Sequence, residues 1–436
     1  MRTSLSLFGA LTAALGIAAT SNAQAQTLAP PATRPAQGLF DRAPENNQQL
    51  DLSMLFLSAY DDNLAANDSG GTNPVNSQTQ RGGGYDGLTS RVAYSKKFSH
   101  GTIAFSEGSS VRYYPSLADI VSLQHAAIAG ATVQVQGMRI SIGQTLEYLP
   151  FFAFANTPKL FDSATAELPP VVGDQAMVRR DQRVFSSSLG VTQQLGGRTS
   201  LSANANLRRA NFLSESIGQT TKELGARLSR KLTRDLSIVL GYSYQDGVYA
   251  PTAIDAVPVR IHNLDVGVDY NHALGRTRRT TIGFTTGSSE IDGDSRGPQR
   301  QFTGSARLNR EIGRTWHATA LYRRGAGFVD GFAQPMFADS VATSIGGTIS
   351  RRVELALVGN YSKGGIGFGA GSSENKSYNG SAKARIAIAR RLVVSAEYFY
   401  FRYHFADAAV LPAGVPADVN RQGARIGLEL WLPVIR

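Results

Sequence analysis

Hydrophobic and polar residues alternate along most of this chain with a period of two. A typical run sets an apolar series against a polar one: Leu236, Ile238, Leu240, Tyr242 and Tyr244 against Ser237, Gly241, Ser243 and Gln245. The runs 381–388 and 424–430 repeat the pattern, and their charged residues fall on the polar side. Because successive side chains of a β-strand point to opposite faces, the alternation predicts strands with one apolar and one polar face.

The alternating runs form hairpins joined by short, mostly basic turns. The turns recur roughly every 38 residues, as copies of one structural unit would, and lie near Ser99, Gly137, Gly197, Thr233, Gly275, Gly313, Arg351 and Arg390. These hairpins, with one further strand at each end of the series, predict about 18 strands. The gap between the second and third turns is longer. We interpret it as one long loop; two extra short strands there are the other reading, and the alternative totals are about 16 or 20 strands.

Hairpins of this kind predict an all-β fold, a transmembrane antiparallel up-and-down β-barrel. The first strand is expected at 51–60. Short turns should face the periplasm and long connections the outside. The long connections are expected at 61–84, 114–122, 148–181, 211–219, 246–259, 288–300, 325–339, 363–376 and 404–420.

The N-terminus has the pattern of a secretory signal. Arg2 precedes an apolar run from Leu5 to Ala19, and Ala23-Gln24-Ala25 is a small-x-small cleavage site. Residues 1–25 are therefore predicted to be a signal peptide, cleaved after Ala25 or alternatively after Ala23. The Pro- and Gln-rich stretch 26–50 is predicted to be a disordered periplasmic lead-in, followed by the barrel at 51–436. The expected location is the outer membrane of a Gram-negative cell.

Composition excludes several classes of protein. The chain has no cysteine, so it is neither a lipoprotein nor a disulfide scaffold, and thiol-ligated metals are excluded. The net charge of +11 comes from Lys and Arg scattered among turns and strands, without the stacking aromatics that accompany them at nucleic-acid sites. The six histidines show no HExxH pairing, and no Gly-x-Ser-x-Gly motif is present. His404 near Asp407 is more typical of a polar loop contact than of catalysis. We therefore expect no enzyme activity, no cofactor and no metal site.

The last strand carries a motif for assembly. Arg425, Gly427, Leu430 and Leu432 follow a polar-x-Gly-x-x-apolar-x-apolar pattern. This pattern is similar to the signal by which outer-membrane barrels are passed to the barrel-assembly machinery. Such proteins usually end at an aromatic residue, whereas 433–436 follow here. Because Pro433 has no N–H to donate, the strand is expected to stop there.

The start of the predicted barrel, Leu52-Ser53-Met54-Leu55-Phe56-Leu57-Ser58-Ala59-Tyr60-Asp61-Asp62-Asn63, resembles the opening of β-barrel porins of proteobacteria, in which a first strand ends in a Tyr-Asp-Asp-Asn loop. The resemblance implies a porin-like barrel in the outer membrane. A role in exopolysaccharide export is ascribed to some members of these families, so the resemblance also implies that role as an alternative.

Charged residues on the polar side of the strands are expected to line the lumen. The cations are Arg91, Arg112, Arg139, Arg208, Arg227, Lys231, Arg307, Arg323, Lys383, Arg385 and Arg425; the anions are Glu147, Glu223, Asp265, Asp269, Glu354, Glu397 and Glu429. The excess of cations favours a mild anion preference. The competing interpretation, which we weight more heavily, is that opposite charges pair and brace the wall.

The longest connection, 148–181, is unusually apolar at its start. Long loops are commonly functional, and this one is predicted either to fold inward as a constriction or to form a surface flap or two strand extensions. The residues of the constriction interpretation are Phe151, Phe152, Phe154, Lys159, Arg179 and Arg180.

The sequence thus predicts a porin-like channel for passive diffusion of small hydrophilic solutes, with a mild anion preference. The alternatives are an outer-membrane component of exopolysaccharide export and a structural barrel occluded by loop 148–181. Expected partners are outer-membrane lipid and lipopolysaccharide, the barrel-assembly machinery, and small hydrophilic or anionic solutes, but no nucleic acid. Small residues on the outer face (Ala203, Ala205, Ala382 and Ala384) are compatible with a homo-oligomer.

Overall fold

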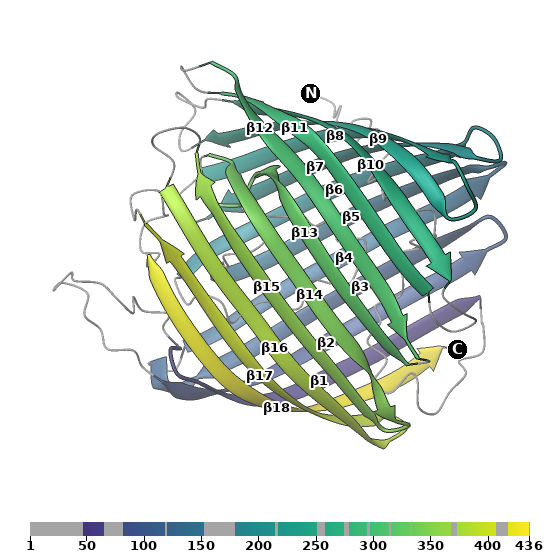
Figure 1. The fold of residues 1–436 in the computed structure, drawn as a ribbon. Coiled ribbons are helices and arrows are strands. Elements are labelled where there is room, and N and C mark those ends of the chain that lie inside the picture. Colours follow the sequence, from purple (N-terminus) through teal and green to yellow (C-terminus); the bar gives the residue numbers. More distant parts are fainter. Residues whose placement is uncertain are drawn as a thin grey trace, which may run out of the picture.

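The protein folds into a ring of antiparallel strands inclined to the barrel axis (Figure 1). The structure, a computed structural model, describes residues 47–64, 82–117, 120–151, 179–213, 217–250, 258–273, 279–293, 297–313, 315–332, 334–367, 373–406 and 417–435. The strands are β1 (Gln48–Asp61), β2 (Gly83–Phe98), β3 (Gly101–Tyr114), β4 (Ile120–Val135), β5 (Met138–Phe151), β6 (Arg179–Gln194), β7 (Thr199–Phe212), β8 (Ile217–Lys231), β9 (Leu236–Ala250), β10 (Val259–Ala273), β11 (Arg279–Asp292), β12 (Gln299–Ile312), β13 (Trp316–Gly327), β14 (Met336–Ser350), β15 (Val353–Ile366), β16 (Ser373–Ala389), β17 (Leu392–Phe405) and β18 (Asp418–Ile435). One short 3-10 helix, Pro115–Leu117, follows β3.

Each strand pairs with its neighbours in sequence, and β1 also pairs with β18, so the 18-stranded sheet closes on itself. The predicted all-β, antiparallel up-and-down barrel is confirmed, and the alternative totals of 16 and 20 strands are wrong. β5 pairs directly with β6, so no further strand of the sheet lies between them, and residues 152–178 lie outside the described residues. The nine long connections fall within the predicted ranges.

Two strand boundaries differ from the sequence-based expectation. β1 begins at Gln48, three residues before Asp51, because Gln48, Gln49 and Leu50 already pair with β2. β18 does not stop at Pro433 but runs to Ile435. Pro433 pairs with Asp51 and Ile435 with Leu50, so the register skips one residue, and this bulge accommodates the residue that has no N–H.

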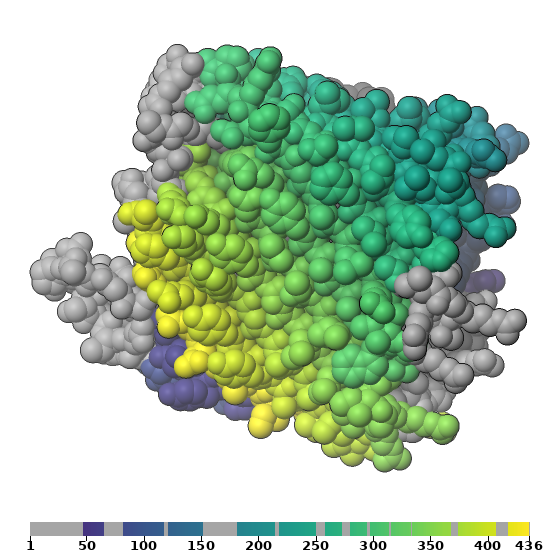
Figure 2. Space-filling view, viewed as in Figure 1, coloured from purple at the N-terminus to yellow at the C-terminus, as the bar shows by residue number. Residues whose placement is uncertain are grey.

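The two faces of the sheet differ in chemistry as the alternation predicts. Outward side chains are large and apolar on most strands, for example Phe302 and Ile426, which are 82% and 65% exposed. The strands of the C-terminal half form a closely packed outer surface on the side seen in Figure 2. Within the described residues, no helix is long and apolar enough to cross a membrane. A closed sheet with an apolar outside is the architecture of outer-membrane barrels.

The Asp61-Asp62-Asn63 motif clamps the closure between β1 and β18. Asp61 Oδ2 accepts a hydrogen bond from Arg421 Nε at 2.5 Å, and both side chains are fully buried. Asn63 Nδ2 donates to the carbonyl of Asn420 at 3.1 Å. Asp62 Oδ1 accepts from the N–H of Gln422 at 2.8 Å. The first strand and the last are therefore joined by side chains as well as by the backbone ladder.

We expect Asp61→Leu to lower the free energy of unfolding by about 3–5 kcal/mol, because it leaves the Arg421 guanidinium buried without its carboxylate. The double variant Asp61→Leu/Arg421→Met should recover most of that loss. Denaturant unfolding of the refolded barrel in lipid vesicles, followed by tryptophan fluorescence, measures both.

The matched control is Asp62→Leu. Its carboxylate is partly exposed, and it should lose only about 1 kcal/mol, the value of one hydrogen bond. Equal losses in the Asp61 and Asp62 variants would contradict the assignment of the closure to the buried pair.

Candidate channel lumen and its constriction

The inner wall carries many polar side chains, beside buried apolar clusters such as the one around Phe401 and Tyr403. On β11, for example, the inward series is Thr281, Gly283, Thr285, Gly287 and Ser289, and on β16 it is Asn375, Ser377, Asn379 and Ser381, followed by Lys383 and Arg385. Short polar side chains leave room inside the barrel and present hydroxyl and amide groups to it. At about 18 strands a barrel of this kind leaves an aqueous lumen instead of filling with side chains.

The strand register places the predicted lumen charges on this inner face. They are Arg91, Arg112, Arg139, Arg208, Arg227, Lys231, Arg307, Arg323, Lys383, Arg385 and Arg425, with Glu147, Glu223, Asp265, Asp269, Glu354, Glu397 and Glu429. Among these cations, ion pairs with acids are made by Arg208, Arg227, Arg307, Lys383, Arg385 and Arg425.

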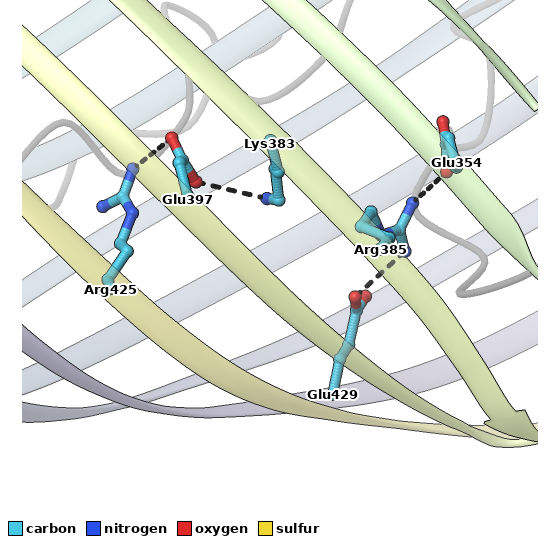
Figure 3. A network of polar contacts seen from close by, with 6 residues as sticks. All are labelled: Glu354, Lys383, Arg385, Glu397, Arg425 and Glu429. Carbon is cyan, nitrogen blue, oxygen red and sulfur yellow. Dashed lines mark hydrogen bonds and ion pairs between the residues drawn. The ribbon is translucent and has the colours of Figure 1, made fainter.

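Figure 3 shows two ion-pair groups on neighbouring strands β15 to β18. In the first, Glu397 binds Arg425 at 2.8 Å and Lys383 at 3.6 Å, one cation at each carboxylate oxygen. In the second, Arg385 lies between Glu354 at 3.1 Å and Glu429 at 3.0 Å. Each group joins three strands, so the charges brace the wall and largely neutralise one another.

A third group lies further round the wall, where Asp269 of β10 is nearly buried. It lies 3.7 Å from Arg227 of β8 and 3.3 Å from Arg307 of β12. Asp265, four residues earlier on β10, differs: among the described residues it makes no hydrogen bond or ion pair. The wall therefore carries both paired and solvent-facing charge.

One connection leaves the wall and enters the lumen. Residues 328–335 join β13 to β14, and all but residue 333 are described. The carbonyl of Val329 accepts from the N–H of Phe332 at 3.2 Å, and Gly331 has φ +89°, so the chain turns tightly. Val329 and Phe332 are buried, although a connection on the outer surface would expose them. We call residues 328–335 the constriction segment.

The polar side of the constriction segment is bound to strands β6, β7 and β8. Asp330 accepts from Arg208 Nε at 2.9 Å, and Arg208 Nη2 contacts its second oxygen. Gln182 Nε2 also donates to Asp330, at 3.3 Å. The N–H of Gly331 donates to Oε1 of Gln219 at 3.0 Å. A bidentate arginine–carboxylate pair is among the stronger hydrogen-bonded contacts in proteins, so this end is firmly held.

The apolar side of the segment packs on β14, β15, β17 and β18. Phe332 stacks on Phe405, with ring centroids 6.1 Å apart. The buried cluster around it comprises Val329, Phe332, Met336, Ala338, Ile366, Phe401, Tyr403, Phe405 and Val419. In the ring, β7 and β17 are separated by seven strands one way and nine the other. The constriction segment therefore bridges nearly opposite walls and narrows the lumen.

The constriction predicted in loop 148–181 cannot be compared with this arrangement residue by residue. Phe152, Phe154 and Lys159 lie outside the described residues. Phe151 ends β5 and pairs with Arg179, the first residue of β6, and Arg180 follows in β6. That constriction stays a prediction, and the predicted signal peptide and most of the predicted lead-in also lie outside the described residues.

Sequence reasoning gave no role to Asp330 of the constriction segment or to Arg421 of the closure, and it named Asp61 only as part of the motif at the end of the first strand. Asp330 falls in the predicted connection 325–339 and has the local pattern of a solvated Val-Asp-Gly turn. Arg421 immediately follows the predicted connection 404–420, and Asp61 begins another. The one usable signal was the apolar Phe-Val before Asp330-Gly331-Phe332, which is unusual for an exposed loop.

The remaining predicted positions are found as follows. Arg425 and Gly427 of the assembly motif face inward on β18, while Leu430 and Leu432 face outward beside Met54 and Leu52. Asp407 lies outside the described residues, and His404 contacts Asp418 at 3.2 Å. No group of three or more metal-ligating side chains occurs among the described residues.

No family model and no curated protein matches the chain. Solved structures that are similar include OccK11 (OpdR) of Pseudomonas aeruginosa, with 12% identity over 92% of this chain and 99% of that chain and a TM-score of 0.42. OccK2 (OpdF) of the same organism, in complex with glucuronate, has 8% identity over 89% and 99% and a TM-score of 0.45. OccAB4 of Acinetobacter baumannii has 10% identity over 88% and 98% and a TM-score of 0.42.

Replacing Arg208 with Gln should speed amide hydrogen exchange in the constriction segment by about tenfold to a hundredfold, because the segment loses a charge-assisted contact. The N–H of Gly331, bonded to Gln219, is the most informative reporter. Exchange followed by mass spectrometry measures it.

The matched control is the next residue, Arg209, which is on the outer side of β7 and bonds Asn211. Arg209→Gln should leave exchange in the segment unchanged. If the two variants exchange alike, the Arg208–Asp330 anchor does not hold the segment.

Proposed function

We propose that this protein is a passive channel for small hydrophilic solutes in the outer membrane of a Gram-negative bacterium. The observation that carries the proposal is the constriction segment, held across a lumen whose wall is rich in polar and charged side chains. A polar wall offers water and solutes hydrogen bonds at each level. A segment that crosses the lumen and is anchored on two sides limits the size of solute that can pass, without blocking the lumen completely.

The pairing of wall charges bears on selectivity. Beyond the charges expected from sequence, the structure adds Arg421 to the cations and Asp61 and Asp330 to the anions, and Arg421 is itself paired with Asp61. Because most of the strongly placed charges neutralise each other, we propose at most a mild anion preference. It would arise from cations such as Arg139, which contacts Gln134 instead of an acid.

Neither alternative from the sequence has a described contact in its favour. Exopolysaccharide export stays a prediction, as do the barrel-assembly machinery and lipopolysaccharide as partners. An occluded structural barrel is separated from a channel by conductance, since an occluded lumen passes no ions.

Replacing residues 329–334 by a Gly-Ser linker of equal length should raise single-channel conductance about twofold, because the bridge between opposite walls is lost. Recording in planar bilayers measures it. Deletion of 153–176 is the companion experiment. If that deletion enlarges the conductance and the linker does not, the constriction lies in loop 148–181 instead.

Glu397→Gln should shift the reversal potential in a KCl gradient toward the equilibrium potential of chloride. The substitution removes the negative charge that lies beside Arg425 and Lys383. Glu374→Gln is the matched control: Glu374 is exposed at the start of β16 and binds Lys363 and Lys376. A shift of the same size in both variants, or none in Glu397→Gln, would show that the paired wall charges do not govern selectivity.

A further inference from the structure

The outer face of the barrel, which is apolar on most strands, carries polar side chains at mid-height on β3 to β6. On most strands the outward residue near the middle is apolar, such as Leu224, Val266 and Leu357, each about half exposed. On β3 it is Glu107, which alternates with the outward Phe105 and Val111. On β5 it is Gln144, which shares its face with the outward Leu146. A carboxylate and an amide thus face the membrane at mid-depth.

These polar groups are only partly satisfied within the chain. Ser109 Oγ donates to Glu107 Oε1 at 2.6 Å. Ser187 Oγ donates to Gln144 Oε1 at 2.9 Å. Among the described residues, Glu107 has no ion pair and Gln144 Nε2 has no acceptor. Ionisable groups on a lipid-facing surface are costly and call for a partner. Here one site offers an acceptor oxygen and the other offers donor hydrogens.

The two groups are placed symmetrically about β4. Glu107 is the seventh of the 14 residues of β3, and Gln144 is the seventh of the 14 residues of β5. β3 and β5 run in the same direction, so both groups lie at the same depth. Between them lies β4, whose outward residues there are alanines. Ala127 pairs with Glu107 of β3, and Ala129 pairs with Gln144 of β5. Alanines let two surfaces approach closely.

We propose that this face packs against the same face of a second copy of the chain, about a two-fold axis along the membrane normal in front of β4. Such an axis brings β3 of one copy opposite β5 of the other. Gln144 Nε2 of each copy then donates to Glu107 of the other, and the alanines meet at the centre. A two-fold interface needs a surface complementary to itself, and an acceptor and a donor at equal depth on either side of a small-residue strand meet that requirement. The inference rests on the barrel spanning a membrane and not on solute transport.

Cysteine cross-linking tests the arrangement directly, because the chain has no cysteine of its own. Ala129→Cys, oxidised in native outer membranes, should give a disulfide-linked species with the mass of two chains. The control is Ala320→Cys, outward on β13, nine strands from β4 in either direction. It should remain monomeric. Absence of the dimer in Ala129→Cys, equal dimer in both variants, or a linked protein of different mass would each overturn the proposal.

A second variant separates the polar contacts from general proximity. Glu107→Leu/Gln144→Leu in the Ala129→Cys background removes donor and acceptor while suiting a lipid-facing surface, so the barrel should still fold and conduct. The cross-linked fraction should fall at least about tenfold, the equivalent of about 1.4 kcal/mol. Undiminished cross-linking, with folding verified by heat-modifiable gel mobility, would show that Glu107 and Gln144 do not hold the copies together. Conductance measured in parallel keeps failure of this inference distinct from failure of the channel proposal.

Discussion

Every backbone N–H and C=O that enters hydrocarbon needs a hydrogen-bond partner within the protein, and the closure between β1 and β18 meets that requirement here. An open sheet of the same strands would leave two edges unpaired in the membrane. Once the ring is closed, the direction of every side chain is decided by parity along its strand. The outer apolar face, the polar inner wall and the position of each charge all follow from that single condition.

Charged side chains on the inner wall are arranged in ion-pair groups. Arg385 between Glu354 and Glu429, and Glu397 between Arg425 and Lys383, each tie three strands of the wall together. The constriction segment uses both kinds of interaction available inside the barrel. Its carboxylate is held by an arginine on one wall and its phenyl ring by aromatics on the other.

The strands could be predicted from sequence because alternation is a local property that each run displays by itself. The inner-face charges follow from the same parity. The constriction segment could not, since Asp330 and Arg208 are 122 positions apart and nothing near either residue specifies the other. The extension of β18 past Pro433 was likewise hidden, because it depends on a bulge against a strand from the opposite end of the chain. Local sequence patterns therefore predict the strands of the wall. What occupies the lumen depends on contacts between residues far apart in the sequence, which local patterns do not predict.

The clamp between Asp61 and Arg421 also has a consequence in time. Its two residues are separated by 360 positions, nearly the whole length of the barrel. Contacts between such distant residues form slowly, because the entropy of closing the intervening loop must be overcome before they contribute anything. The edge of β1 that pairs with β18 therefore stays unpaired until β18 has been synthesised and has reached it. No short part of the barrel can close before the rest. The open sheet that precedes closure has exposed edges and is the state that most needs protection from aggregation.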